Sequence, residues 1–143
     1  MPATAGAAVV DSMAVSALIN ETRRRRTAQA YRQLIGDRRI VCSFITVTEL
    51  RFGALKAGWG DLRRRALERD LARIVIVQPD DRLMHICAEL RATCALAGHP
   101  LGQKIHEADR WIAATALRLG VPLVSADSVY QHVADLHVLA PST

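Results

Sequence analysis

Four acidic residues have the type and the placement to do chemistry together: Asp11, Glu49, Asp109 and Asp127. Three of them stand at or just after short apolar runs, AAVVD, IVCSFI and PLVSAD. Clustered carboxylates repel one another and raise one another's pKa, and a hard divalent cation such as Mg²⁺ or Mn²⁺ removes that penalty. A cation held in this way can activate water and offset charge during phosphodiester cleavage. The four acids therefore predict a metal-dependent site for phosphate chemistry.

Asp109 lies in an amphipathic segment, KIHEADRWIAATALRLG, that favours a helix over residues 104–120. At about 100° per residue, Asp109 shares the apolar face with Ile105, Ile112, Ala113, Ala116 and Leu119. The opposite face, which we expect to be solvated, carries Glu107, Arg110, Ala114 and Arg118. Glu107 can pair with Arg110 one turn later, whereas Asp109 has no cation three or four positions on. A lone carboxylate on a packing face is costly unless a backbone cap, a buried partner or a metal ion compensates it.

Each acid also has a purely structural interpretation. Glu49 completes the sequence Thr46-Val47-Thr48-Glu49, which fits a capping box with Thr46 as the N-cap. Asp11 and Asp127 can cap helices that begin one residue later, and a first helical turn favours an anion at Asp109. Taken singly, these acids leave both interpretations open. Taken together at one predicted edge, they favour a functional site.

The elements that must position these acids alternate along the chain. Strands are expected at residues 7–11, 40–45, 74–78, 121–125 and 137–140. Helices are expected at residues 12–20, 23–36, 46–57, 61–72, 80–97, 104–120 and 128–134. This order predicts an α/β fold, a three-layer α/β/α sandwich with a mainly parallel central sheet, formed by residues 1–143 as a single domain. Ligands of such sheets bind beyond the carboxyl ends of the strands, where Asp11, Glu49 and Asp127 are expected.

The composition fits a folded, basic protein. Half of the 143 residues are hydrophobic, which is enough for a real core. The net charge is +5, and because only Lys56 and Lys104 are lysines, 19 − 2 = 17 of the cations are arginines. Arginine suits phosphate through its planar fork, although a high-GC genome would enrich it as well. The densest runs, residues 23–26 and 63–65, fit either RNA backbone contacts or solvated helix ends.

Other features exclude several classes of protein. Three cysteines at these spacings do not form a disulfide framework. No apolar run has the length of a membrane span, and the first residues lack the basic region of a signal peptide. We therefore expect a soluble, cytoplasmic protein without a membrane partner.

The motifs around the acids resemble those of PIN-domain nucleases, and more narrowly those of VapC-type toxins from bacterial toxin–antitoxin pairs. They are Asp11, then TVTELRFGAL, ADRWIAATA and PLVSAD in that order, so the resemblance covers nearly the whole chain. It implies a PIN-like fold and a Mg²⁺- or Mn²⁺-dependent endoribonuclease. The substrate would be structured RNA such as tRNA or rRNA. A cognate antitoxin would neutralise the enzyme, and a homodimer is expected.

The resemblance also assigns roles to individual residues. Asp11, Glu49, Asp109 and Asp127 match the family's acidic quartet and are the expected catalytic residues. Asp11 and Asp109 would be the main metal ligands, and the other two acids would complete the site directly or through water. Ser125 matches the family's small hydroxyl residue, so Ser12 and Ser125 are expected to support the acids. Lys104, Arg23 and Arg24 are the candidate RNA contacts.

Two departures from the family pattern keep alternatives open. The first motif is Asp11-Ser12-Met13, where the family has a polar third residue, and a thioether is only a weak acceptor. Ala108 replaces the common asparagine before the third acid. A degenerate, non-catalytic PIN scaffold that binds only RNA or an antitoxin is one alternative. A receiver-like or haloacid-dehalogenase-like phosphoryl-transfer domain is another, but both would need a second acid near Asp11.

Overall fold

The protein folds around a five-stranded sheet in which every strand is parallel to its neighbours. The structure is a computed structural model that describes residues 6–142. Along the sheet the strands follow the order β3-β2-β1-β4-β5. Their bounds are Ala7–Val10 (β1), Arg39–Ser43 (β2), Val75–Val77 (β3), Leu123–Val124 (β4) and Val138–Leu139 (β5). The expected parallel sheet is confirmed, with strands shorter than their apolar runs.

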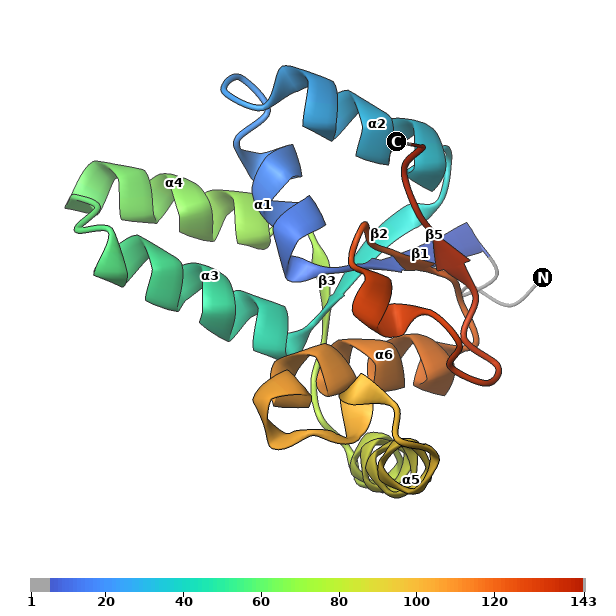
Figure 1. Cartoon of the computed structure of the whole chain (residues 1–143). Coiled ribbons are helices and arrows are strands. Elements are labelled where there is room, and N and C mark those ends of the chain that lie inside the picture. The colour runs from blue at the N-terminus through green and yellow to red at the C-terminus, as the bar shows by residue number, and fades with distance from the viewer. Residues whose placement is uncertain (1–5, 143) are drawn as a thin grey trace.

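Helices cover both faces of this sheet. The α-helices are Ser12–Ile19 (α1), Arg25–Ile35 (α2), Phe44–Lys56 (α3), Asp61–Leu71 (α4), Asp81–Ala97 (α5) and Glu107–Leu119 (α6). Short 3-10 helices span Pro100–Gly102 (η2), Lys104–His106 (η3) and Ser128–Tyr130 (η4). Figure 1 shows α5 and α6 on one side of the sheet and α1 and α2 on the other, with α3 and α4 projecting as a helical hairpin. The predicted three-layer α/β/α sandwich is confirmed.

Alternation along β1 explains the two cores. Val9 packs into the core under α5 and α6, whereas Ala8 and Val10 pack into the core under α1 and α3. Successive strand residues point to opposite faces, so a central strand covered on both faces must be apolar throughout. β1 therefore anchors both layers, and its carboxyl end lies in the middle of the sheet edge.

Helix α3 begins earlier than the capping-box pattern indicates. Its N-cap is Ser43, whose hydroxyl accepts a hydrogen bond from the main-chain N of Ile45 at 3.3 Å. Thr46 is fully buried within the first turn of the helix. The predicted capping box of Thr46 and Glu49 is therefore wrong, and Glu49 lies inside α3 with its side chain exposed.

The segment from 104 to 120 also departs from the predicted single helix. Residues 104–106 form the separate turn η3, so the helical wheel does not extend to Ile105, which is 83% exposed. Arg110, expected on the solvated face, is only 3% exposed and donates to the main-chain oxygens of Leu101 (2.7 Å) and Gln103 (3.1 Å). It therefore forms no pair with Glu107. The segment 100–106 therefore covers Arg110, whereas Glu107 on the same predicted face stays exposed.

The helix expected at residues 128–134 is reduced to the short 3-10 helix η4. His132 and Asp135 have left-handed backbone angles (φ 63° and 66°), which end helical geometry.

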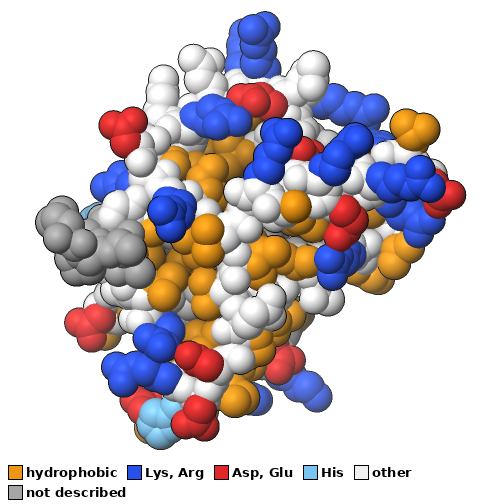
Figure 2. Space-filling model, turned by 180° about the vertical axis from the view of Figure 1, so that it is seen from behind, with side chains coloured by type: hydrophobic (Ala, Val, Ile, Leu, Met, Phe, Trp, Pro, Cys, Tyr) orange, Lys and Arg blue, Asp and Glu red, His pale blue; other side chains and the backbone are white. Residues whose placement is uncertain are grey.

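Between residues 6 and 142 the structure contains no helix with the length and apolarity of a membrane span. Figure 2 shows basic side chains spread over the rear face with acidic ones among them, so they form no single stripe there.

Candidate active site

Asp11 lies at the centre of the sheet edge, immediately after β1, and is 5% exposed. One carboxylate oxygen accepts a hydrogen bond from the main-chain N of Ala14 at 2.8 Å, which caps α1. The other accepts a short hydrogen bond from the Ser125 hydroxyl. Its own main-chain N donates to the oxygen of Val124 at 3.1 Å. Asp11 is thus both the predicted helix cap and a carboxylate fixed between two neighbouring strands.

The electrostatics of Asp11 show which acids lie near it. Burial raises the pKa of Asp11, and the hydrogen bonds from Ser125 and Ala14 offset part of that shift. The negative charges of Asp127 and Asp109 raise the pKa further. A like charge has this effect only at short range. Three of the four predicted acids therefore gather at one end of the sheet.

Asp109 has protein partners on both of its oxygens. His106 donates from Nδ1 to Oδ2 at 2.9 Å, and the Tyr130 hydroxyl donates to Oδ1 at 3.3 Å. The helical wheel predicted that the Asp109 side chain is buried. This prediction is wrong, because the side chain is 31% exposed. Tyr130 is buried beneath the acids, and its pKa is raised by that burial and by the charges of Asp109, Asp11 and Asp127.

Asp127 is linked to Asp11 through the Ser125 hydroxyl. The main-chain N of Asp127 donates to the Ser125 hydroxyl at 3.0 Å, so this hydroxyl forms hydrogen bonds with both Asp11 and Asp127. The Asp127 carboxylate accepts from the main-chain N of Val129 at 2.9 Å and caps η4. The capping interpretation of Asp127 is therefore correct, and the exposed residue still lies close enough to act on the pKa of Asp11.

Glu49 is linked to Ser12, the residue that follows Asp11, and not directly to the other three acids. The Ser12 hydroxyl donates to Oε1 of Glu49 at 2.6 Å and lies 3.0 Å from the hydroxyl of Thr46. Ser12 thus supports Glu49 rather than Asp11. Met13 is 66% exposed and is not among the hydrogen-bond partners of Asp11. The polar support for Asp11 that the first motif lacks at position 13 comes instead from Ser125 and from the main-chain N of Ala14.

The carboxylates gather without forming a ready-made cage. In the described part of the chain, no three His, Cys, Asp or Glu side chains converge closely enough to hold a metal ion by themselves. The available oxygen atoms are nonetheless hard ligands, and Mg²⁺ commonly takes only one or two carboxylates and keeps several waters. The donor set suits such a cation, and it offers no thiolate, since all three cysteines lie away from it in the cores.

Sequence reasoning missed Tyr130 and Thr46 and understated His106. Tyr130 follows Asp127 by three positions, a spacing that indicates nothing without knowledge of the turn at η4. Thr46 was assigned to a cap, although it is a buried neighbour of Ser12. His106 stands three positions before Asp109, and this i,i+3 spacing could have indicated their pair.

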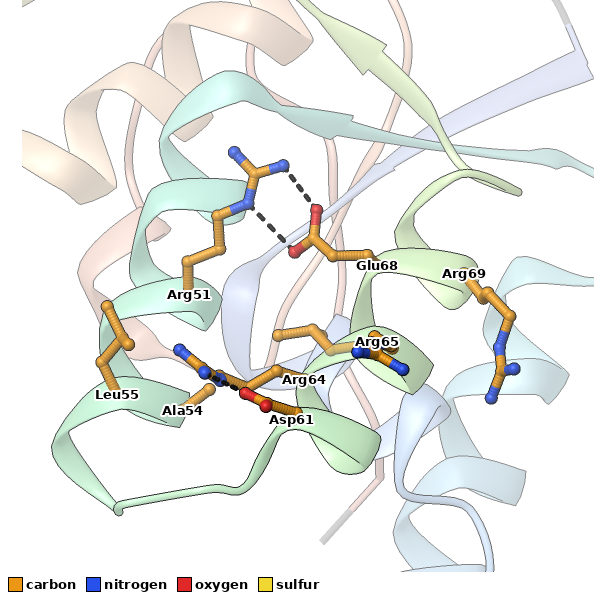
Figure 3. Close-up of a pocket in the computed structure, with 9 residues that line it drawn as sticks. Arg51, Ala54, Leu55, Asp61, Arg64, Arg65, Glu68 and Arg69 are labelled. Carbon is orange, nitrogen blue, oxygen red and sulfur yellow. Dashed lines mark hydrogen bonds and ion pairs between the residues drawn. The ribbon is translucent and has the colours of Figure 1, made fainter.

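The candidate RNA contacts lie outside the acid cluster. Lys104 is exposed on η3. Arg23 and Arg24 are exposed just before α2 and line a cavity of about 490 Å³ together with Ser12 and Glu49. A separate cavity of about 760 Å³ lies against the α3–α4 hairpin and includes none of the acids of the cluster (Figure 3).

Known proteins are similar to this chain in sequence. The PIN domain family model matches residues 8–136. Ribonuclease VapC1 of Haemophilus influenzae is 29% identical over 117 residues, which cover 81% of this chain and 84% of that protein. Ribonuclease VapC5 of Mycobacterium tuberculosis is 32% identical over 96 residues, which cover 66% and 67% of the two chains.

Solved structures agree with these matches. The VapBC-1 structure from nontypeable Haemophilus influenzae superposes with a TM-score of 0.73 at 27% identity, and covers 93% of this chain and 96% of its own. The VapBC-5 structure from Mycobacterium tuberculosis gives a TM-score of 0.68 at 26% identity, with 94% and 98% covered. With a family model that spans most of the sequence and a fold shared from end to end, this chain belongs to the PIN-domain family.

Proposed function

We propose that the protein is a metal-dependent endoribonuclease, the VapC-type toxin of a toxin–antitoxin pair. The observation that supports this most is the buried carboxylate of Asp11 with Asp109 and Asp127 within electrostatic range of it. A fold gains no stability from gathering like charges, so the arrangement is best explained by a ligand that needs them. The names of the relatives, Ribonuclease VapC1 and Ribonuclease VapC5, favour RNA as the substrate.

In this proposal Asp11 and Asp109 are the main metal ligands, and Glu49 and Asp127 complete the site directly or through water. A divalent cation, Mg²⁺ or Mn²⁺, would activate the attacking water and offset charge on the phosphate. The protein's own contribution is to fix the ligands. Ser125 orients Asp11, while Tyr130 and His106 hold the two oxygens of Asp109.

The proposed partners follow from the same relatives. The titles of the similar structures describe VapBC complexes, which supports a cognate antitoxin for this chain as well. Structured RNA such as tRNA or rRNA is the proposed substrate class, and a homodimer is the proposed assembly. Co-expression with the gene that adjoins this one, followed by purification of a complex, tests the antitoxin.

Asp109→Asn tests the chemistry. The variant keeps the shape and the acceptor for Tyr130 but removes the charge, so RNA cleavage in Mn²⁺ should fall by at least about 100-fold. Asp81→Asn, at an exposed position in the first turn of α5, is the matched control and should cleave normally. Melting temperatures of both variants establish that they are folded.

A non-catalytic scaffold is the competing function, and the lack of three converging ligands among residues 6–142 favours it. Calorimetric titration with Mn²⁺ separates the two. Saturable binding that Asp109→Asn abolishes supports the nuclease. No binding to the wild-type protein would leave a scaffold that contacts only RNA or an antitoxin.

A further inference from the structure

The arginines of the α3–α4 hairpin fall into two groups according to whether a carboxylate neutralises them. Arg51 pairs with Glu68 at 2.7 Å and Arg64 pairs with Asp61 at 2.6 Å. Figure 3 shows both pairs on the face of the hairpin that lines the cavity of about 760 Å³. On this face Arg51 and Arg64 are balanced by a carboxylate, whereas Arg65 and Arg69 form no ion pair with a described residue.

The cavity on the other side of the hairpin, toward α1, is lined by one arginine of α4 and by two that precede α2. Arg23, Arg24 and Arg63 line the cavity of about 490 Å³, which Ser12 and Glu49 also line. Within residues 6–142, none of these three arginines has a carboxylate within 4 Å. The volume lies in the range of pockets that hold small ligands. The cavity therefore holds three arginines without an ion pair to a described residue, together with Glu49, among apolar residues such as Leu50 and Leu67.

Arg63 is held in place within this cavity. Its guanidinium lies over the ring of Trp59 at 3.7 Å from the ring centroid. Trp59 in turn packs against the core under α1. Stacking on a fixed aromatic face leaves the planar fork of arginine free to donate hydrogen bonds in its own plane. Arg63 consequently loses less side-chain entropy on binding a phosphate than a freely moving surface arginine would.

We propose that Arg63, positioned by Trp59, forms with Arg23 and Arg24 a phosphate-binding subsite for the RNA strand next to the cleaved bond. This inference rests on the proposed function, because it names where the substrate of that same site is held. Charge complementarity supports it, since a strand of RNA carries one phosphate per nucleotide. Continuity supports RNA over an acidic peptide, because the cavity wall includes Ser12, which directly follows Asp11, and Glu49, the fourth proposed acid, to which Ser12 donates.

The experiment measures binding rather than cleavage, so it is independent of catalysis. Fluorescence anisotropy would follow a labelled, mixed-sequence single-stranded RNA of about 16 nucleotides binding to the full chain carrying Asp109→Asn. In that background, Arg63→Gln should weaken binding about tenfold, the loss of one charged hydrogen-bond partner. The slope of log affinity against log salt should fall by about 0.7.

Arg64→Gln is the matched control. It removes the same charge one position along the same helix, but from an arginine already paired with Asp61 on the opposite cavity. It should change affinity by less than about twofold, in line with the small worth of an exposed pair. Equal losses in the two variants, or no loss in either, would overturn the subsite.

A second set of variants tests the positioning by Trp59. Trp59→Phe keeps an aromatic face and should bind RNA nearly as the parent does, whereas Trp59→Leu should weaken binding. The loss in Trp59→Leu should disappear when Arg63 is already glutamine, because the tryptophan then has nothing to position. Additive losses would contradict that role.

The outcomes also separate this inference from the proposed function. RNA binding that depends on Arg63 in a protein that never cleaves RNA would retain the subsite and reject the nuclease. RNA cleavage by a protein whose RNA binding does not depend on Arg63 would retain the nuclease and reject the subsite. If Arg63→Gln leaves RNA binding intact but prevents co-purification with the antitoxin, the cavity is a protein-docking site and the RNA subsite is rejected.

Discussion

Asp11 occupies a position where a carboxylate is costly to the fold. It is buried, and the charges of Asp127 and Asp109 act on it in addition. Two hydrogen bonds, from Ser125 and Ala14, recover part of the cost. Because the pKa of the folded state is raised, the folded protein holds the proton more tightly than the unfolded chain does. Ionised Asp11 therefore lowers the free energy of unfolding.

We expect Asp11→Asn to stabilise the metal-free protein by about 0.5–2 kcal/mol near neutral pH. The amide keeps the acceptor for Ala14 and can donate to Ser125, but it carries no charge to bury. The wild-type free energy of unfolding should fall as pH rises from the ordinary aspartate value of 3.8 toward the raised folded value.

Urea denaturation in EDTA across this pH range is the measurement. The Asn variant should lack the component of the pH dependence that belongs to Asp11. A variant less stable than wild type would mean that the hydrogen bonds to the charged form outweigh its burial, contrary to the direction of the pKa shift.

At the scale of elements, the approach of η2 to α5 determines where the His106 partner of Asp109 lies. Gly102 fits so closely that an added Cβ would lie 2.4 Å from the main-chain N of Ala95. Arg110, from inside α6, donates to the carbonyls of Leu101 and Gln103. Together these contacts fix the path of residues 100–106, and that path brings His106 beside Asp109.

Gly102→Ala should destabilise the fold by about 1–3 kcal/mol or more, because the clash is with backbone that has no rotamer to change. Gly53→Ala is the control substitution in the interior of α3, where the added Cβ meets nothing within 4 Å. It should stabilise by about 0.5–1 kcal/mol through helix propensity. In thermal unfolding, the melting temperature should fall for Gly102→Ala and rise for Gly53→Ala if the packing at η2 is as described.

Periodicity predicted the existence and order of these elements because their apolar runs are long and clear. The acids at the ends of β1 and β4 could be placed for the same reason: parallel strands end at a common edge. The helical wheel predicted Ile105 as buried and Arg110 as exposed, and both predictions were wrong. No local pattern reveals that a loop folds back over a helix. Tyr130 beneath Asp109 is a tertiary contact of the same kind and leaves no trace in local spacing. Trp59 and Arg63 are at i,i+4, a spacing that could have indicated their contact.

At the scale of the whole molecule, a bound cation should stabilise the folded state. A ligand that binds only the folded protein adds about 2.7 kcal/mol at a concentration one hundred times its Kd. We therefore expect Mn²⁺ to raise the melting temperature of the wild type and of Asp81→Asn, and to leave that of Asp109→Asn unchanged. An equal rise in all three proteins would place the binding elsewhere and would reject Asp109 as a ligand.

The hydrogen bond between Ser125 and Asp11 joins residues 114 positions apart, and this has a consequence for the order of synthesis. β1 lies between β2 and β4 in the sheet, but along the chain β4 is made after β1, β2 and β3. Until Leu123–Ser125 emerges, Asp11 lacks its serine, its neighbouring strand and the Asp127 and Tyr130 side chains. The proposed site is thus incomplete in any nascent chain that has not reached β4, and the proposed cleavage of RNA should not begin before that strand is made.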